Sequence, residues 1–192
     1  MQIQQSNTAK LPSIYGNFEV KAFREGDKEH LAIFTKSIYD KSQVPLLRVH
    51  SECLTGDVLG SQRCDCQSQL HLALQMIEKE GGMVLYLRQE GRGIGLLNKI
   101  NAYVLQEQGY NTVEANHQLG FSDDERTYEI VHHILEDFGV SQIRLITNNP
   151  SKLSIFESST VEIVDRVPII TQTNEHNSGY MDTKRDEMGH LI

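Results

Sequence analysis

Three cysteines within fourteen residues constrain the fold of this chain more than any other feature of its sequence. Cys53, Cys64 and Cys66 are the only cysteines among its 192 residues. An odd number of thiols so close together makes a poor disulfide framework and a suitable set of metal ligands. Three protein ligands leave one position of a tetrahedral zinc ion open, which distinguishes catalytic from structural zinc. The spacing therefore predicts a bend that gathers three thiolates, and a hydrolytic reaction that uses activated water.

A second explanation of the cluster is that the cysteines are small buried hydrophobic residues. The side chains around them fit a dry core badly, since they are Gln62, Arg63, Asp65 and Gln67. A cation beside a cysteine favours the thiolate over the thiol, and Arg63 precedes Cys64 directly. The metal site explains this composition better.

A third explanation is a zinc site like that of the nucleobase deaminases, whose sequences combine His-x-Glu with Pro-Cys-x-x-Cys. Here His50-Ser-Glu52 precedes Cys64-x-Cys66, with one residue too few between the cysteines and no proline before them. Cys53 also supplies a third thiolate. We therefore expect His50 and Glu52 to line a substrate pocket and not to bind the metal.

Composition and charge restrict the class of protein. With 39% hydrophobic and 23% charged residues, the chain is typical of one globular domain with a buried core. No apolar run reaches the roughly 18 residues of a membrane span, and residues 1–12 lack the apolar core of a signal peptide. Free thiols in such a chain indicate a cytoplasmic protein. A net charge of −8 argues against nucleic acid as a partner, although basic residues near the middle suit a small anion.

Hydrophobic periodicity predicts a mixed α/β (α+β) fold in a single domain, with antiparallel strands first and alternating strands and helices afterwards. The N-terminal strands are expected at 16–24 and 29–38, joined by a turn at 25–27, and at 44–49. Later strands are expected at 83–87, 143–147 and 161–167. Helices are expected at 67–80, 96–108, 127–138 and 150–157. The tail from about 174 to 192 is polar, with a short helical stretch near its end.

Two loops that follow predicted strands are candidate anion sites. Gly91-Arg-Gly-Ile-Gly95 lacks the last glycine of the dinucleotide fingerprint, because position 96 is leucine. A glycine-rich turn whose amides and Arg92 face an anion fits better. In Thr147-Asn-Asn-Pro-Ser-Lys152, Asn149 suits a helix N-cap, so free amides and Lys152 would converge on a phosphate. An ordinary strand–turn–helix junction explains the second loop equally well.

Two further polar motifs have a plain structural explanation. Four charged residues at 123–126 precede a predicted helix, where acidic groups interact favourably with the helix dipole. A working aspartate beside Arg126 would require burial against the zinc pocket. His117 fits a hydrogen-bonded structural histidine better than a metal ligand.

Together, these motifs resemble the GTP cyclohydrolase II family. The agreement is dense over roughly residues 44–192 and extends to residues 9–18. The segment at 182–190 agrees with the family as well. Six motifs occur in the order found in the family: residues 48–57 (RVHSECLTGD), 63–66 (RCDC), 88–96 (RQEGRGIGL), 113–120 (VEANHQLG), 124–126 (DER) and 145–150 (LITNNP). Six motifs in order are far more specific than any one of them.

The resemblance implies an enzyme that opens the imidazole ring of GTP and releases formate and pyrophosphate. The product would be 2,5-diamino-6-ribosylamino-4(3H)-pyrimidinone 5′-phosphate, the first intermediate of riboflavin biosynthesis. It also implies one domain over residues 1–192, one catalytic Zn²⁺ per chain on Cys53, Cys64 and Cys66, Mg²⁺ bound with the triphosphate, and a homodimer.

The resemblance assigns roles to individual residues as well. Asp124 would act as general base, Arg126 would attack the α-phosphate, and Tyr103 would take part in the ring chemistry. GTP would be bound by Arg48, Val49, His50, Ser51, Glu52, Gln69, Glu90, Gly91, Arg92, Thr112, Thr147 and Lys152.

One residue departs from the family pattern, and two alternative functions stay open. The family usually has glycine after the Cys-x-Cys pair, where this chain has Gln67, so a positive φ there would strain the backbone. The alternatives are a family variant that stops at the ring-opened formamide or acts only on phosphates, and a zinc-stapled module that binds GTP without turnover. Tyr103 favours the full reaction. The sequence has no fourth cysteine and no spaced histidine pair to close a structural zinc site.

Overall fold

Eight strands form one mixed sheet in the computed structural model, which describes residues 3–186 and 188–191. The strand order is β1-β3-β4-β6-β5-β7-β8, and β2 pairs with β3. The strands are β1 (Gln4–Gln5), β2 (Ala9–Ser13), β3 (Gly16–Glu25), β4 (Lys28–Phe34), β5 (Leu46–Ser51), β6 (Gly82–Leu87), β7 (Gln142–Ile146) and β8 (Glu162–Val167). This arrangement confirms the predicted mixed α/β class.

The sheet is antiparallel in its N-terminal part and parallel in its C-terminal part. β3 pairs antiparallel with β1, β2 and β4, and β4 pairs antiparallel with β6. β5 is parallel to both β6 and β7, and β7 is parallel to β8. Strands β1 and β2 were not predicted. They are short and mostly exposed, so they lack the alternation of apolar and polar residues that marks a half-buried strand.

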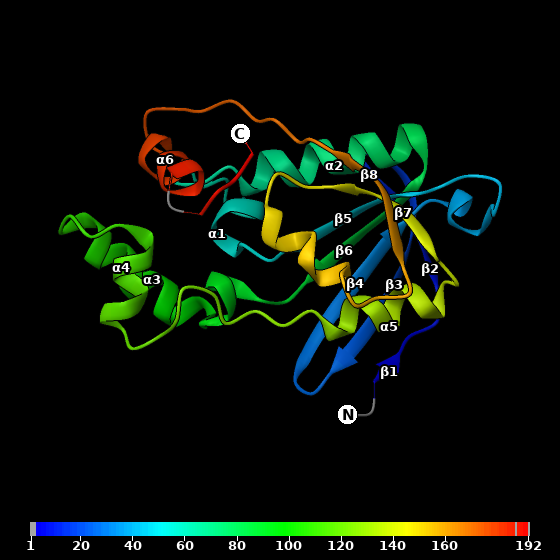
Figure 1. The fold of residues 1–192 in the computed structure, drawn as a ribbon, viewed down its shortest axis with the longest axis horizontal. Helices are drawn as coiled ribbons and strands as arrows, with labels where there is room; N and C mark the ends of the chain where they lie inside the picture. The colour runs from blue at the N-terminus through cyan, green and yellow to red at the C-terminus, as the bar shows by residue number, and fades with distance from the viewer. Residues whose placement is uncertain (1–2, 187, 192) are drawn as a thin grey trace.

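Two helices cover the two faces of the sheet (Figure 1). Helix α2 (Cys66–Glu80) buries Ala73, Leu74 and Ile77 in one apolar cluster, whereas α5 (Glu129–Asp137) buries Ile130 and Ile134 in the other. Both helices follow the predicted periodicity, and α2 ends before Gly81, whose φ of 84° suits a glycine stop. The sheet is thus buried between two layers, which fixes the strand ends that carry the site.

Strand β5 distributes its residues between these layers by simple alternation. Leu46 lies in the cluster under α2, and Leu47 and Val49 lie in the cluster under α5. Arg48 and His50 therefore face the α2 side, and the Arg48 guanidinium contacts Gln69 of α2. The carboxyl ends of β5, β6 and β7 meet at one edge of the sheet, where open α/β sheets commonly bind ligands.

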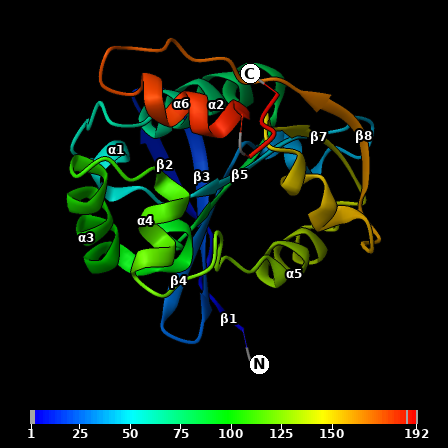
Figure 2. The same cartoon turned by 60° about the vertical axis from the view of Figure 1, so that its left-hand side comes forward.

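Further helices gather at this end of the molecule, as Figures 1 and 2 show. They are α1 (Leu54–Asp57), α3 (Gly95–Glu107), α4 (Thr112–Gln118) and α6 (Ser178–Asp186). α3 and α6 were predicted, but α4 was not. Its signal was present in the sequence, because Asn111 and Glu114 form a capping box at its start. None of the helices in the described ranges is long and apolar enough to cross a membrane.

Two predicted elements differ from the structure. The strand expected at 29–38 ends at Phe34, and a short 3₁₀ helix, η1 (Lys36–Tyr39), follows it. The helix expected at 150–157 consists of two 3₁₀ turns, η3 (Pro150–Lys152) and η4 (Ser154–Phe156). Ser154 Oγ donates to the Ser151 carbonyl, and such local bonds compete with the α-helical pattern in a segment too short for cooperative helix formation.

Candidate active site

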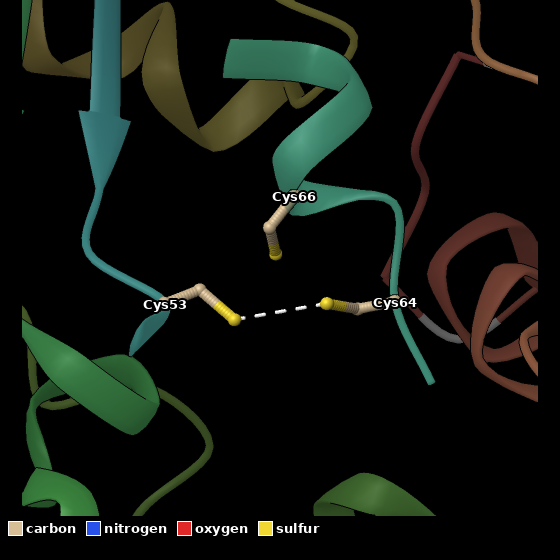
Figure 3. A group of neighbouring side chains, drawn as sticks. All are labelled: Cys53, Cys64 and Cys66. Carbon is tan, nitrogen blue, oxygen red and sulfur yellow. Dashed lines mark hydrogen bonds between the residues drawn. The ribbon is translucent and has the colours of Figure 1, made fainter. Parts of the chain in front are cut away.

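The three cysteine sulfurs converge where β5, the loop after α1 and the start of α2 meet (Figure 3). Their sulfur atoms all lie within 4.8 Å of one another, and the Sγ atoms of Cys53 and Cys64 are 3.6 Å apart. Tetrahedral zinc with Zn–S bonds of about 2.3 Å requires sulfurs roughly 3.8 Å apart. Among the described residues, no further His, Cys, Asp or Glu side chain joins this group. The predicted cluster is therefore assembled, and its donor set and spacing fit zinc with one open position.

Gly56 keeps the space beside these sulfurs free. A Cβ atom at this buried position would lie 2.9 Å from Cys64 Sγ and 3.0 Å from Cys53 Sγ. Real Cβ atoms essentially never come that close, so any other residue would push the sulfurs apart. The backbone of α1 thus forms one wall of the cluster.

The Asp57 carboxylate ties the loop that carries Cys53 to the sheet. It accepts hydrogen bonds from the backbone N–H of Cys53 at 2.9 Å and from the Tyr86 hydroxyl at 2.8 Å. His50 Nε2 lies 3.2 Å from both carboxylate oxygens. Burial lowers the pKa of His50, so the neutral ring donates to Asp57. Strands β5 and β6 thereby hold the first cysteine in a fixed position.

Lys99 is the cation that contacts a thiol. Its Nζ donates to Cys53 Sγ at 3.1 Å and to Glu90 Oε1 at 2.7 Å. Burial alone would lower the pKa of Lys99, but the hydrogen bond to Glu90 and the charge of Cys53 raise it. We expected Arg63 to play this part, and the structure corrects that expectation. The Arg63 guanidinium bonds Glu107 and lies 4.9 Å from the centre of the Tyr103 ring.

The three thiols interact closely enough to shift one another's pKa in opposite directions. Hydrogen bonds from Cys64 and Cys66, followed by the charge of Lys99, lower the pKa of Cys53. The hydrogen bond that Cys64 makes to Cys53 raises its own pKa to about 11, and the pKa of Cys66 is raised for the same reason. Because metal ligands must be deprotonated, metal uptake at this cluster releases protons.

A pocket opens beside the cluster and collects nearly all predicted site residues. It lies at the carboxyl ends of β5, β6 and β7. The predicted residues that line it are Arg48, His50, Ser51, Glu52, Cys53, Cys64, Cys66, Gln69, Glu90, Gly91, Arg92, Tyr103, Thr112, Arg126, Thr147 and Lys152. Val49 and Asp124 are the two that do not line it.

Val49 is fully buried in the core cluster under α5, because alternation along β5 turns its side chain away from the pocket. Only its backbone approaches the site, and its carbonyl accepts a hydrogen bond from Lys152 Nζ. A role for Val49 in binding substrate therefore stays a prediction about its main chain.

Buried cations define the part of the pocket beyond the sulfurs. Arg48 donates to the Ile146 carbonyl at 3.0 Å and to Gln69 Oε1 at 2.6 Å. Burial lowers its pKa to about 10. Burial, followed by the charges of Arg48 and Arg126, lowers the pKa of Lys152 as well. Within the described residues, neither Arg48 nor Lys152 forms a salt bridge, so this region suits an anion.

Asp124 and Arg126 form a two-bond pair at the edge of the pocket. Arg126 Nε donates to Asp124 Oδ1 at 2.8 Å, Nη2 bonds the other carboxylate oxygen, and Nη1 donates to Ser51 Oγ at 3.1 Å. Burial would raise the pKa of Asp124, but the hydrogen bonds and charge of Arg126 lower it overall. The Arg126 side chain is 10% exposed and α5 begins only at Glu129. The motif is thus more than a solvated helix start.

Tyr103 lies on the sulfur side of the pocket. Its hydroxyl is 3.1 Å from Thr55 Oγ1, and Thr55 Oγ1 is 3.8 Å from Cys53 Sγ. Burial raises the pKa of Tyr103, so the hydroxyl stays protonated at neutral pH. The tyrosine is therefore a proton donor next to the position where a metal would be held.

The glycine-rich loop has an unusual backbone conformation. Gly91, Arg92 and Gly93 all have positive φ, and the value of 60° at Arg92 is the one such case among the described residues other than glycine. Gln67, in contrast, lies in the first turn of α2 without a positive φ. The strain considered for Gln67 is absent, and its amide donates to the Asp57 carbonyl at 3.3 Å.

The C-terminal segment supplies lining residues that the sequence did not reveal. Lys184 of α6 forms a buried ion pair of 2.5 Å with Asp65, the residue between two of the cysteines. Figure 2 shows α6 beside α2. The other lining residues that were not predicted include Gln89, Asn116, Tyr180, Met188 and His190. The tail residues were not predicted because the composition of a polar tail is the same whether the tail is solvated or folds over a polar site.

His117 is a structural histidine, as expected. It is 54% exposed and hydrogen-bonds the Asp123 carboxylate at 2.5 Å. It does not line the pocket.

Comparison with known proteins gives a consistent result. A family model described as GTP cyclohydrolase II matches residues 4–168. Proteins named GTP cyclohydrolase-2 from Campylobacter fetus subsp. fetus (strain 82-40) and Helicobacter pylori (strain Shi470) are 54% and 53% identical to this chain. One from Campylobacter hominis is 55% identical. Each match covers 100% of this chain and 97% to 99% of the relative.

Proposed function

Because this chain belongs to the GTP cyclohydrolase II family, we propose that it opens the imidazole ring of GTP and releases formate and pyrophosphate. The product would be 2,5-diamino-6-ribosylamino-4(3H)-pyrimidinone 5′-phosphate, the first intermediate of riboflavin biosynthesis. One water opens the ring, a second releases the formyl group and a third replaces pyrophosphate. The observation that supports this proposal best is the assembled thiol cluster beside a pocket lined by buried cations.

Cys53, Cys64 and Cys66 would hold one Zn²⁺ whose fourth position faces the pocket. When bound, such an ion lowers the pKa of a coordinated water to about 7 and so supplies a nucleophile at neutral pH. The room left by Gly56 and the sulfur spacing support this assignment.

The purine would lie at the sulfur end of the pocket, between Tyr103 and the end of β5. The protonated Tyr103 hydroxyl can donate to a ring nitrogen as the imidazole opens. His50 and Ser51 line the same region, and Asp57 fixes the orientation of the His50 ring. These residues would place C8 of the guanine towards the cysteines.

The triphosphate, with its Mg²⁺, would occupy the cation end. Arg48 and Lys152 are buried there, and no carboxylate of the described residues forms an ion pair with either, so a phosphate would relieve their mutual repulsion. Fixed positive charge also stabilises the charge that develops as pyrophosphate leaves. Arg92 and Thr147 line this pocket and would add donors.

Arg126 and Asp124 would act as a pair in the phosphate chemistry. Attack by an Arg126 nitrogen on the α-phosphorus forms a P–N bond and breaks the bond to pyrophosphate, with the guanidinium proton passing to Asp124. Water then hydrolyses the P–N bond. Both oxygens of Asp124 are engaged by Arg126 in the free protein. The base therefore becomes available only when Arg126 turns towards the phosphate.

We propose further that residues 1–192 function as one domain in a homodimer, as the family resemblance implies, and that the protein is cytoplasmic, as its free thiols indicate. Its small-molecule partner is GTP. The net charge of −8 gives no basis for a nucleic-acid partner.

Product analysis tests the proposed function. Purified protein with GTP, Zn²⁺ and Mg²⁺ should yield formate, pyrophosphate and the pyrimidine product together, as measured by mass spectrometry and a pyrophosphate assay. A product that still carries the formyl group would support the variant that stops at the formamide. GTP binding without any product would support the binding module.

A further inference from the structure

Lys99 is a buried lysine that lines the pocket and whose ammonium group also donates a hydrogen bond to a cysteine sulfur. It lies on α3, at a position where the helix faces the thiol cluster, and it is 8% exposed. Its Nζ donates to Cys53 Sγ at 3.1 Å and to Glu90 Oε1 at 2.7 Å. The Tyr103 ring centre is 5.7 Å away. These contacts come from the loop after β5, the loop after β6 and α3, so the site is built by the fold.

Glu90 and Gly91 fix this lysine in place. Glu90 Oε1 also accepts from the backbone N–H of Gly91 at 2.9 Å, and Oε2 accepts from the N–H of Leu54 at 2.6 Å. Leu54 follows Cys53 directly, so one carboxylate connects the ligand loop to the lysine. A Cβ at Gly91 would lie 3.1 Å from Lys99 Cβ. A glycine at this position leaves room for the lysine stem.

The local charge explains why a lysine is placed there. Three thiolates around a divalent ion leave one negative charge, and the buried Glu90 carboxylate adds a second beside it. Buried charge is costly unless it is paired and hydrogen-bonded. Of the described residues, Lys99 is the one whose ammonium donates a hydrogen bond to a cysteine sulfur. Its single positive charge serves the sulfur and the carboxylate together.

We propose that Lys99 is a positioning residue of the metal centre, which balances the charge of the thiolate ligands and sets the donor strength of Cys53. This inference deepens the proposed function, because it takes the metal to be held by the three cysteines. A hydrogen bond to a thiolate withdraws electron density from sulfur, so the metal keeps more of its Lewis acidity. Without Lys99, Glu90 and the thiolates would repel each other across a buried space.

Zinc affinity gives the first test. In Lys99→Met, which keeps the length of the side chain without its charge, zinc should bind about 10- to 100-fold more weakly in competition with a chromophoric chelator, as is typical when an outer-shell partner is lost. Lys99→Arg keeps the charge and should stay within about threefold of wild type. Lys79→Met, an exposed lysine of α2, is the matched control and should bind zinc like wild type.

The Co²⁺-substituted protein gives a second readout that a general loss of stability would not change. Its sulfur-to-cobalt charge-transfer band should move to lower energy in Lys99→Met, because a thiolate without a hydrogen-bond donor is easier to oxidise. Lys79→Met should leave the band where it is.

Lys99→Gln is also uncharged, and it replaces the methionine variant if that chain does not fold. It should show the same loss of zinc affinity.

The outcomes separate this inference from the proposed function. Wild-type protein that binds no zinc would overturn both. Wild-type protein that binds zinc, with Lys99→Met equal to it in affinity and in cobalt spectrum, would overturn the role of Lys99 alone. A Lys99→Arg variant that loses as much affinity as the uncharged variants would also overturn it, since shape and not charge would then matter. If neither uncharged variant folds, the arginine variant decides. Zinc affinity within about threefold of wild type supports the role of Lys99, and a loss of about 10-fold or more overturns it.

Discussion

The two ends of the pocket differ in how well their charges are satisfied. At the thiol end, defined by Cys53, Cys64 and Cys66, Lys99 and Glu90 form a closed network of hydrogen bonds. At the cation end, defined by Arg48, Arg126 and Lys152, only Arg126 forms an ion pair with a carboxylate in the part of the chain that the structure describes. The thiol end is thus prepared before substrate binds, whereas the cation end is incomplete without an anion.

This difference explains how one pocket can serve two chemistries. A metal site must keep its ligands in place between turnovers, and a satisfied network does so. A phosphate site gains binding energy when the anion relieves repulsion already present in the free protein. Changes at the thiol end should therefore abolish ring opening. Loss of an unpaired cation at the other end should weaken substrate binding and stabilise the protein without substrate.

Cys64→Ser should have the largest effect. Loss of one thiolate should remove zinc, and ring opening should fall by more than about 10³-fold, because water that is not bound to metal has a pKa near 15.7. Formate release, followed by mass spectrometry, is the measurement. GTP binding at the cation end should persist. Formate production at the wild-type rate would show that the thiol end takes no part in the chemistry.

Arg126→Lys should come next. Lysine keeps the charge but cannot make the two-bond contact with Asp124, so pyrophosphate release should drop by about 10²- to 10³-fold while the fold survives. A coupled pyrophosphate assay measures the rate, and circular dichroism checks the fold. Turnover at the level of the unmodified enzyme would remove Arg126 from the chemistry.

Lys152→Met should separate binding from stability. The KM for GTP should rise by about 10- to 100-fold, because a charge-assisted contact to phosphate is lost. The protein without GTP should gain about 2–4 °C in melting temperature, equivalent to roughly 1 kcal/mol for a chain of this size, since a buried cation beside Arg48 is removed.

The pH dependence of this variant has a defined sign. The folded pKa of Lys152 is below its unfolded value, so the unfolded chain binds more protons between the two. The destabilisation is fully present below the folded pKa, and wild-type stability rises as pH increases from there to about 10.4. The advantage of the methionine variant should therefore shrink over that range in denaturant titrations. An advantage that grows with pH would contradict a buried, repelled lysine.

Gln67→Gly should have the smallest effect. It restores the residue usual in the family, but Gln67 lies in a helix without a positive φ. Glycine should therefore cost about 0.5–1 kcal/mol of stability, with zinc content unchanged. Thermal unfolding measures the cost. A more stable glycine variant would mean that position 67 is strained after all.

The sequence predicted the cysteine cluster itself, but not the charged contacts that surround it. Local spacing was enough to gather the cysteines, because all three lie within one bend after β5. The glycine-rich turn was also local, and its positive φ values follow from residues 91–95. Strand β6 was predicted by its apolar run, which is typical of a strand buried on both faces.

What escaped prediction depends on contacts between distant segments. Lys99 reaches Cys53 across 46 positions of sequence, and Lys184 reaches Asp65 across 119. Neither spacing carries a local signal. Arg63 illustrates the same limit, because adjacency to Cys64 suggested a contact that its side chain does not make. Strands β1 and β2 are exposed edge strands that depend on β3 for their pairing.

X-ray absorption at the zinc edge of the purified protein tests the central claim most directly. The account predicts one zinc per chain with three sulfur neighbours at about 2.3 Å and one oxygen neighbour that exchanges with solvent. A metal-free protein with full activity, or zinc closed by a fourth side chain, would contradict it.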